Sequence, residues 1–261
     1  MPVVNQSNLT RAGALRWLSL QHKENVAFSL YIHPLTGRTG IEKLLAQALD
    51  RGEMLDALAE KAAKSPTGSV IFYLMDRGCV VWPPFPLAET VLYRGYEPGP
   101  LKSMLENDWK LGLILIRLGQ WAIGIFKGEK LLDGKAGMGL VHARHKKGGS
   151  SANRFARHRE KQMEYFFTRI EGHARELLEP RFKSLDYIIY GGAFDTLLRM
   201  QKQCHFFESL EDKVVNRLLS VREPRRSSFD QAVEQAYASV LYEFNQALGR
   251  VFKPARRDGR T

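Results

Sequence analysis

Two adjacent glycines, Gly148 and Gly149, lie at the centre of the most basic stretch of the chain. Residues 142–161 read HARHKKGGSSANRFARHREK and contain seven lysines or arginines, three histidines and one glutamate. Glycine adopts backbone conformations that are closed to other residues and lets the main chain approach a partner closely. Cationic side chains and the free N–H groups of a helix N-terminus bind phosphate. The stretch therefore predicts contact with a polyanion.

The positive charge of the chain is concentrated in two segments. The net charge is +11, to which residues 142–161 contribute +6 and the tail GRVFKPARRDGRT (249–261) contributes +4, so that the remainder is close to neutral. Two basic segments on a nearly neutral body favour nucleic acid as the partner. A solvated charge run that aids solubility would explain the tail equally well, but it explains the glycine-centred segment poorly.

A long helix is predicted directly after the glycines, over residues 152–178. Ser150 or Ser151 would cap it and Pro180 would end it. Its buried face follows the i, i+3, i+4 rule through Met163, Phe166, Phe167, Ile170, Ala174, Leu177 and Leu178. The first turns are polar instead, with three cations on one face. The residues predicted to hold RNA are Arg144, His145, Lys146, Lys147, Arg154, Arg157, His158, Arg159 and Lys161.

Other chemistries fit these residues less well. A zinc site could be drawn from four residues of weak spacing, His142, His145, Cys204 and His205. A serine nucleophile at 150 or 151 could use His158 as its base, but no strand–elbow context supports it. The segment GKAGMG (134–139) lacks the Lys-Ser/Thr of a phosphate loop. A nuclease would need a carboxylate cluster near the loop, which the sequence lacks. We therefore predict no metal and no cofactor.

The elements around this region predict an α/β protein. Strands are predicted at 24–34, 69–75, 79–82, 110–118, 120–128, 129–134, 185–192 and 214–221, and helices at 41–64 (with a break at Gly52) and 229–248. The strand at 120–128 is apolar on both faces, which is typical of a sheet covered on each side. The pair Gly191-Gly192 is expected to form a turn.

The expected architecture is a mixed central sheet with helices on both faces, preceded by a smaller α/β N-terminal domain. The expected divisions are 1–100, 101–248 and a basic tail at 249–261. The two cysteines, Cys79 and Cys204, lie in apolar surroundings, which favours free thiols in a reducing compartment. No signal pattern and no apolar run of the roughly 18 residues that a membrane helix needs is present. A cytoplasmic protein without a membrane partner is expected.

The segment KKGGSSANRFARHREKQ (146–162) resembles the Gly-Gly-Gln loop and following helix of archaeal and eukaryotic class I release factors. It is more similar still to the Vms-type (ankyrin-repeat and zinc-finger) peptidyl-tRNA hydrolases and their bacterial relatives, the Vms-like release-factor group. The pattern GG-x-x-x-x-RF-x-R-x-R-E carries the resemblance, which covers roughly residues 105–248 and includes LDYIIYGGAFDTLL and KVVNRLLSVREP. Residues 1–100 resemble the family only in general layout.

The resemblance implies a site at the peptidyl transferase centre of the large ribosomal subunit. In that family a glutamine of the loop helps to place a water against the ester that joins a nascent peptide to tRNA. Here the resemblance places the flexible tip and the water-positioning point at Gly148, Gly149, Ser150, Ser151, Ala152 and Asn153. Ribosomal RNA and peptidyl-tRNA would be the partners.

The chain departs from the family pattern at the glutamine itself. Class I release factors have it directly after the two glycines, where this chain has Ser150. The Vms-like group usually has it three residues after the second glycine, where this chain has Ala152. No glutamine occurs between Gln120 and Gln162, and Asn153 is the nearest carboxamide.

Two functions remain open at this point. The first is hydrolysis of peptidyl-tRNA on stalled ribosomes, with Asn153 doing the work of the glutamine. The second is a non-catalytic ribosome-binding factor, for rescue or dormancy, that has lost the catalytic glutamine. Neither a codon-reading signature in the N-terminal part nor a third domain after about residue 250 is found, so that stop-codon termination is not expected.

Overall fold

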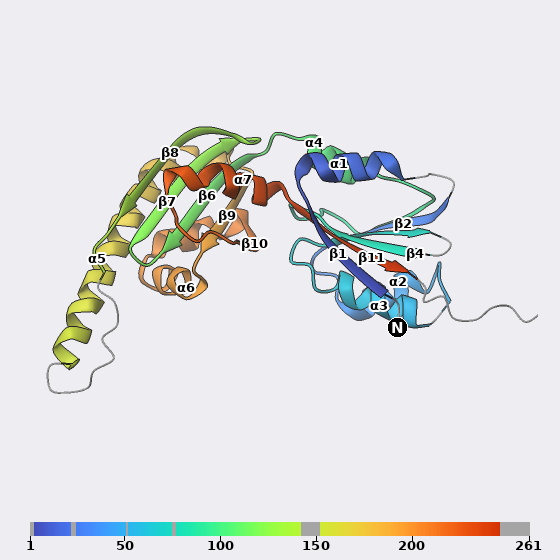
Figure 1. The fold of residues 1–261 in the computed structure, drawn as a ribbon, viewed down its shortest axis with the longest axis horizontal. Coiled ribbons are helices and arrows are strands. Elements are labelled where there is room, and N and C mark those ends of the chain that lie inside the picture. The colour runs from blue at the N-terminus through green and yellow to red at the C-terminus, as the bar shows by residue number, and fades with distance from the viewer. Residues whose placement is uncertain (1–2, 22–24, 51, 75–76, 142–151, 246–261) are drawn as a thin grey trace, which may run out of the picture.

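The computed structural model describes the chain apart from residues 1–2, 22–24, 51, 75–76, 142–151 and 246–261. Two β-sheets organise the described residues, one on each side of Figure 1. No helix among the described residues combines the length and the apolar character that crossing a membrane requires.

The first sheet is antiparallel and has six strands. Their order is β1 (Val3–Leu9), β11 (Ser239–Asn245), β4 (Arg77–Trp82), β3 (Ser69–Leu74), β2 (Val26–Ile32) and β5 (Val91–Arg94). Helices α1 (Arg11–Leu20) and α4 (Gly99–Glu106) cover one face, and α2 (Arg38–Leu45) and α3 (Glu53–Ala62) cover the other (Figure 1). The predicted helix over 41–64 is thus two helices, separated by a segment that contains Gly52.

The second sheet is mixed and has five strands. Their order is β10 (Val214–Leu219), β9 (Tyr187–Gly192), β6 (Lys110–Arg117), β7 (Gln120–Lys127) and β8 (Lys130–Met138), with β10, β9 and β6 parallel. Helices α5 (Ala152–Leu178) and α6 (Phe194–Gln203) and a 3-10 segment (His205–Lys213) cover one face, and α7 (Phe229–Tyr237) covers the other. These two layers confirm the predicted α/β class and the mixed sheet between helices.

The predicted helix over 229–248 is wrong in its second half. The helix α7 ends at Tyr237, and residues 239–245 form β11, which pairs with β1 and β4 in the first sheet. The segment SVLYEFN buries Ser239, Leu241, Tyr242 and Phe244. Short apolar runs satisfy helical and strand periods alike, so that sheet pairing decides between them. The chain therefore returns to the first sheet after the second, while the divisions at residues 100 and 248 stay predictions.

The pair Gly191-Gly192 forms the end of β9 rather than a separate turn, which corrects the expectation from the sequence. Both residues pair with β6, opposite Leu115 and Ile116. Gly192 has a φ of 109°, and a Cβ there would collide with the carbonyl oxygen of Ile116. Only glycine fits this position without strain, because the positive φ and the close backbone approach both exclude a side chain.

Candidate nucleic-acid interface

The part of α5 from Met163 to its end at Leu178 is anchored to the second sheet. The residues predicted for its buried face, from Met163 to Leu178, are each at most 4% exposed and pack in one core with β6, β7 and α6. An ion pair and a ring stack add to this packing. The Nζ of Lys135 on β8 lies 2.5 Å from the Oε1 of Glu176, and the rings of Trp121 and His173 stack with their centroids 4.7 Å apart. The helix is therefore held rigidly from Met163 onward.

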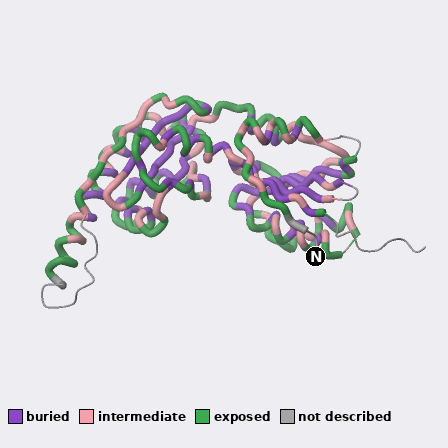
Figure 2. Tube along the Cα trace, in the orientation of Figure 1, coloured by how far each residue is buried: buried purple, intermediate pink, exposed green. Residues whose placement is uncertain are grey.

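The first turns of α5 have no such packing. No residue from 154 to 162 is buried, and Figure 2 shows this part of the helix beyond the core of the sheet. At a rise of 1.5 Å per residue, the segment from Ala152 to Met163 spans about 16 Å. Because the anchored part continues directly into these turns, α5 forms a rod that projects from the domain (Figure 1).

This projecting rod is strongly cationic. Residues 154–162 contain three arginines, one lysine and one histidine against a single carboxylate, Glu160. Arg154, Arg157 and Lys161 are exposed and form no ion pair with another described residue. The guanidinium of Arg154 lies 5.9 Å from the ring of Phe155, which is 49% exposed. An exposed aromatic ring between cations suits RNA, because bases stack on rings while arginines contact phosphates.

The structure describes only part of the predicted site. Arg154, Arg157, His158, Arg159 and Lys161 lie together on the first turns of α5, as the helical spacing predicts. Ala152 and Asn153 begin the same helix. The other predicted residues lie outside the described residues: Arg144, His145, Lys146, Lys147, Gly148, Gly149, Ser150 and Ser151. Their roles, and the capping role of Ser150 or Ser151, stay predictions.

The zinc alternative finds no support among the described residues. Cys204 is 1% exposed in the core beneath α5, and burial raises the pKa of its thiol to about 12. The side chain of His205 is instead 82% exposed and lies 3.2 Å from Glu208. A buried thiol and a solvent-facing imidazole do not converge on one ion. No group of three potential ligands occurs in the described part of the chain, and His142 and His145 lie outside it.

A second basic surface lies beside α7 and was not predicted from the sequence. The segment REPRRSS (222–228) connects β10 to α7 and contributes Arg222 and Arg225 to a groove with a volume of about 820 Å³. Three arginines within five residues were the available signal. They are not adjacent to a glycine pair, and only the fold places two of them, Arg222 and Arg225, in one groove with Arg217 of β10.

A protein-family model described as the Actinobacteria/chloroflexi VLRF1 release factor matches residues 109–242, slightly more than half of the chain. The match includes the whole of the second sheet with α5, and it also includes the groove residues from Arg217 to Val240.

Curated relatives match over a similar region. The chain is 29% identical over 151 residues to peptide chain release factor subunit 1 of Aeropyrum pernix, covering 55% of the chain and 39% of that protein. It is 30% identical over 167 residues to the same factor of Archaeoglobus fulgidus, covering 61% of the chain and 40% of that protein. The chain thus spans about two fifths of the length of these relatives.

Among solved structures, the chain resembles the crystal structure of the archaeal translation termination factor aRF1 with a TM-score of 0.40 and 20% identity, covering 87% of the chain and 71% of that structure. It resembles the Pelota structure of Archaeoglobus fulgidus with a TM-score of 0.30 and 11% identity, covering 88% of the chain and 61% of that structure.

Proposed function

Because the chain belongs to the family of Actinobacteria/chloroflexi VLRF1 release factors, we propose that it hydrolyses peptidyl-tRNA on ribosomes that carry stalled nascent chains. Membership of a release-factor family implies interaction with the ribosome in general. The observation that supports the finer proposal is the cationic, unburied start of α5, which follows directly on the Gly148-Gly149 segment. Such a rod suits a narrow space lined by RNA phosphates.

The chemistry requires little more than positioning. The oxygen of a water attacks the ester carbonyl of peptidyl-tRNA, the bond from that carbon to the ribose oxygen breaks, and the proton of the water ends on the released ribose hydroxyl. Holding the water in line with the ester supplies much of the rate, because it replaces a bimolecular encounter. The cations of α5 would fix the register on RNA, and the segment at 148–153 would place the water.

Within that segment, Asn153 is the best candidate for the polar contact to the water. Its carboxamide can accept a hydrogen bond from a water and donate one to a neighbouring oxygen. Ala152 stands where the Vms-like group usually has glutamine, and it offers no polar group. Gly148 and Gly149 would allow the backbone to approach the ester closely.

A second candidate function is a non-catalytic ribosome-binding factor that occupies the same place in rescue or dormancy. The observation that favours it is the absence of any glutamine between Gln120 and Gln162. Both candidates share the binding mode of α5 and differ only in turnover.

Peptide release from peptidyl-tRNA on purified large subunits distinguishes these candidates. We expect the unaltered chain to release labelled peptide above the rate of free subunits, and Ala152→Gln to release it at least about tenfold faster, since a positioned carboxamide would then occupy the family's place. The control is Ala156→Gln, which introduces the same side chain one turn further along the exposed face of α5. Binding by all three proteins without release by any of them would support the non-catalytic factor.

A further inference from the structure

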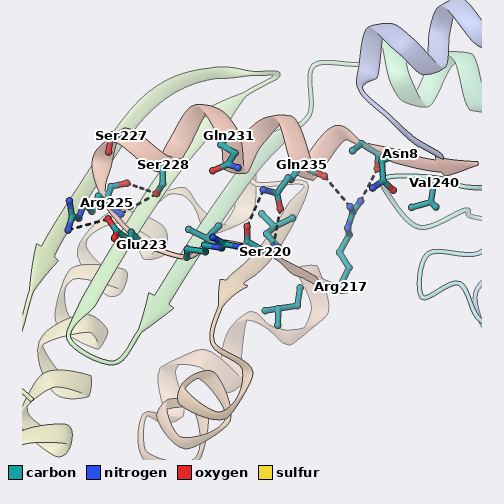
Figure 3. A pocket seen from close by; sticks show the side chains of 15 residues that line it. Asn8, Arg217, Ser220, Glu223, Arg225, Ser227, Ser228, Gln231, Gln235 and Val240 are labelled. Carbon is teal, nitrogen blue, oxygen red and sulfur yellow. Dashed lines mark hydrogen bonds and ion pairs between the residues drawn. The ribbon is translucent and has the colours of Figure 1, made fainter. Parts of the chain in front are cut away.

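A polar groove runs beside α7 on the side of the second sheet opposite α5. It extends from Ser227, in the 3-10 turn before α7, to Val240 on β11, and its volume is about 820 Å³ (Figure 3). The helix alone accounts for about 14 Å of this length. The side chains that give the groove its chemistry are Arg217, Ser220, Arg222, Arg225, Gln231 and Gln235.

Arg217 is a largely buried cation that donates its hydrogen bonds to carbonyl groups. Its Nη1 donates to the carbonyl oxygens of Pro84 (3.2 Å) and Ala238 (3.3 Å), and its Nη2 donates to that of Gln235 (3.0 Å). Loss of hydration lowers the pKa of this guanidinium from its ordinary value, and no carboxylate among the described residues offsets the effect. Buried charges are normally paired with an opposite charge. This one lacks a counter-ion among the described residues.

Two further arginines, outside the lining of the groove, also donate to carbonyl groups. Arg117 donates to the carbonyl oxygen of Arg222 at 3.0 Å, and Arg226 donates to that of Gly134 at 2.9 Å. Carbonyl groups satisfy hydrogen bonds but leave the net charge of a guanidinium in place. Arg117 and Arg226 do not line the groove themselves, so that its positive charge comes from Arg217, Arg222 and Arg225.

Among the residues that the structure describes, a single carboxylate lines the groove. Glu223 lies 3.2 Å from Arg225, and both side chains are more than half exposed. Such a pair is weak, because water screens it. Asp230 and Glu234 on α7 do not line the groove. Three arginines against one weakly paired carboxylate leave the groove cationic.

Neutral polar side chains make up the rest of the polar lining of the groove. The Oε1 of Gln235 accepts from the backbone N–H of Ser220 at 2.9 Å, and its Nε2 donates to the carbonyl oxygen of the same residue at 3.2 Å (Figure 3). These bonds tie α7 to the end of β10. The side chains of Gln231 and Ser227 add further polar atoms along its length.

We propose that this groove binds the phosphodiester backbone of an RNA strand, whose phosphates supply the negative charge that Arg217 and Arg222 lack among the described residues and that Glu223 supplies only weakly to Arg225. An elongated, polar groove suits a strand, with phosphates at the arginines and amides beside the bases. The inference rests on the proposed ribosomal function and extends it. With α5 on one face of the second sheet and the groove on the other, RNA would contact the domain on two sides.

The test measures binding of a labelled short single-stranded RNA to the full chain over a salt series. All proteins in the test carry Arg154→Glu and Arg157→Glu, which should remove RNA binding by α5, so that the assay measures binding by the groove. Arg222→Glu with Arg225→Glu should weaken RNA binding at least about tenfold, and should reduce the slope of log K against log salt by about 1.4, because each contact to a single strand contributes about 0.7. The matched control, Arg16→Glu with Arg94→Glu, changes two exposed arginines near the first sheet and should have no such effect.

The groove variant leaves Arg217 in place because that side chain also holds three backbone segments together. Equal RNA affinity in the groove variant and the control would overturn the proposal. Binding of inorganic pyrophosphate to the groove without binding of RNA would overturn it as well, since the ligand would then be a small phosphate. The assay contains no ribosome and no peptidyl-tRNA, so that failure of the proposed hydrolysis would leave its outcome unaffected.

Discussion

Replacing Arg154 and Arg157 by glutamate should weaken binding to ribosomes at least about 100-fold, because each lost hydrogen bond to a charged phosphate contributes roughly 1.5–3 kcal/mol and tenfold corresponds to about 1.4 kcal/mol. Both side chains are exposed on the projecting part of α5, at a spacing of three residues. Neither forms an ion pair with another described residue, so that the substitutions disrupt no such contact within the domain. Co-sedimentation with large subunits over a salt series measures the effect.

Two features of the result identify its cause. The variant should show a shallower salt dependence than the unaltered chain, because fewer counterions are released on binding. The pair Arg16→Glu with Arg94→Glu carries the same change of charge near the first sheet and should bind as the unaltered chain does. Unchanged co-sedimentation of the α5 variant at moderate salt would contradict the assignment of this helix to RNA.

Replacing Phe167 by alanine should lower the free energy of unfolding by about 3–5 kcal/mol, the usual cost of deleting a buried aromatic ring. Phe167 is 2% exposed and lies in the core that joins α5 to the second sheet. Its loss leaves a cavity about one turn inside the anchored part of the helix, which begins at Met163. Urea denaturation followed by circular dichroism measures the change.

Tyr165 provides the matched control on the same helix. It is 67% exposed, so that Tyr165→Ala removes a ring of similar size with little loss of packing. We expect this control to change the free energy of unfolding by less than about 1 kcal/mol, as surface substitutions usually do. Equal losses in both variants would show that the hydrophobic face of α5 does not anchor it to the sheet.

The sequence predicted α5 well because one signal dominated it. Seven apolar residues from Met163 to Leu178 repeat at helical spacing over four turns, and the structure buries all of them. The apolar repeat does not extend to the residues before Met163, and its absence there predicted that the first turns of the helix are polar. The strand β7 was equally easy to predict from the sequence. Its residues from Trp121 to Phe126 are apolar on both faces, and they lie between two helical layers.

The missed features depend on contacts between distant segments. Nothing local in SVLYEFN distinguishes the end of a helix from a strand, and its conformation is decided by β1 and β4, which lie more than 150 residues earlier. The groove beside α7 was missed for the same reason. Arg217 precedes REPRRSS by only a few residues, but its partners Pro84 and Ala238 come from other parts of the chain, and the groove forms only where these segments meet in the fold.

The central claim is that α5 carries the Gly148-Gly149 segment to the peptidyl transferase centre, and a tethered cleavage probe tests it most directly. The exposed Ala156 is replaced by cysteine and labelled with an iron chelate that generates hydroxyl radicals. Cys79 and Cys204 should stay unlabelled, because both are 1% exposed and burial raises the pKa of each thiol to about 12. We predict cleavage of the ribosomal RNA around the peptidyl transferase centre; cleavage confined to other regions, in a complex that still co-sediments, would contradict the account.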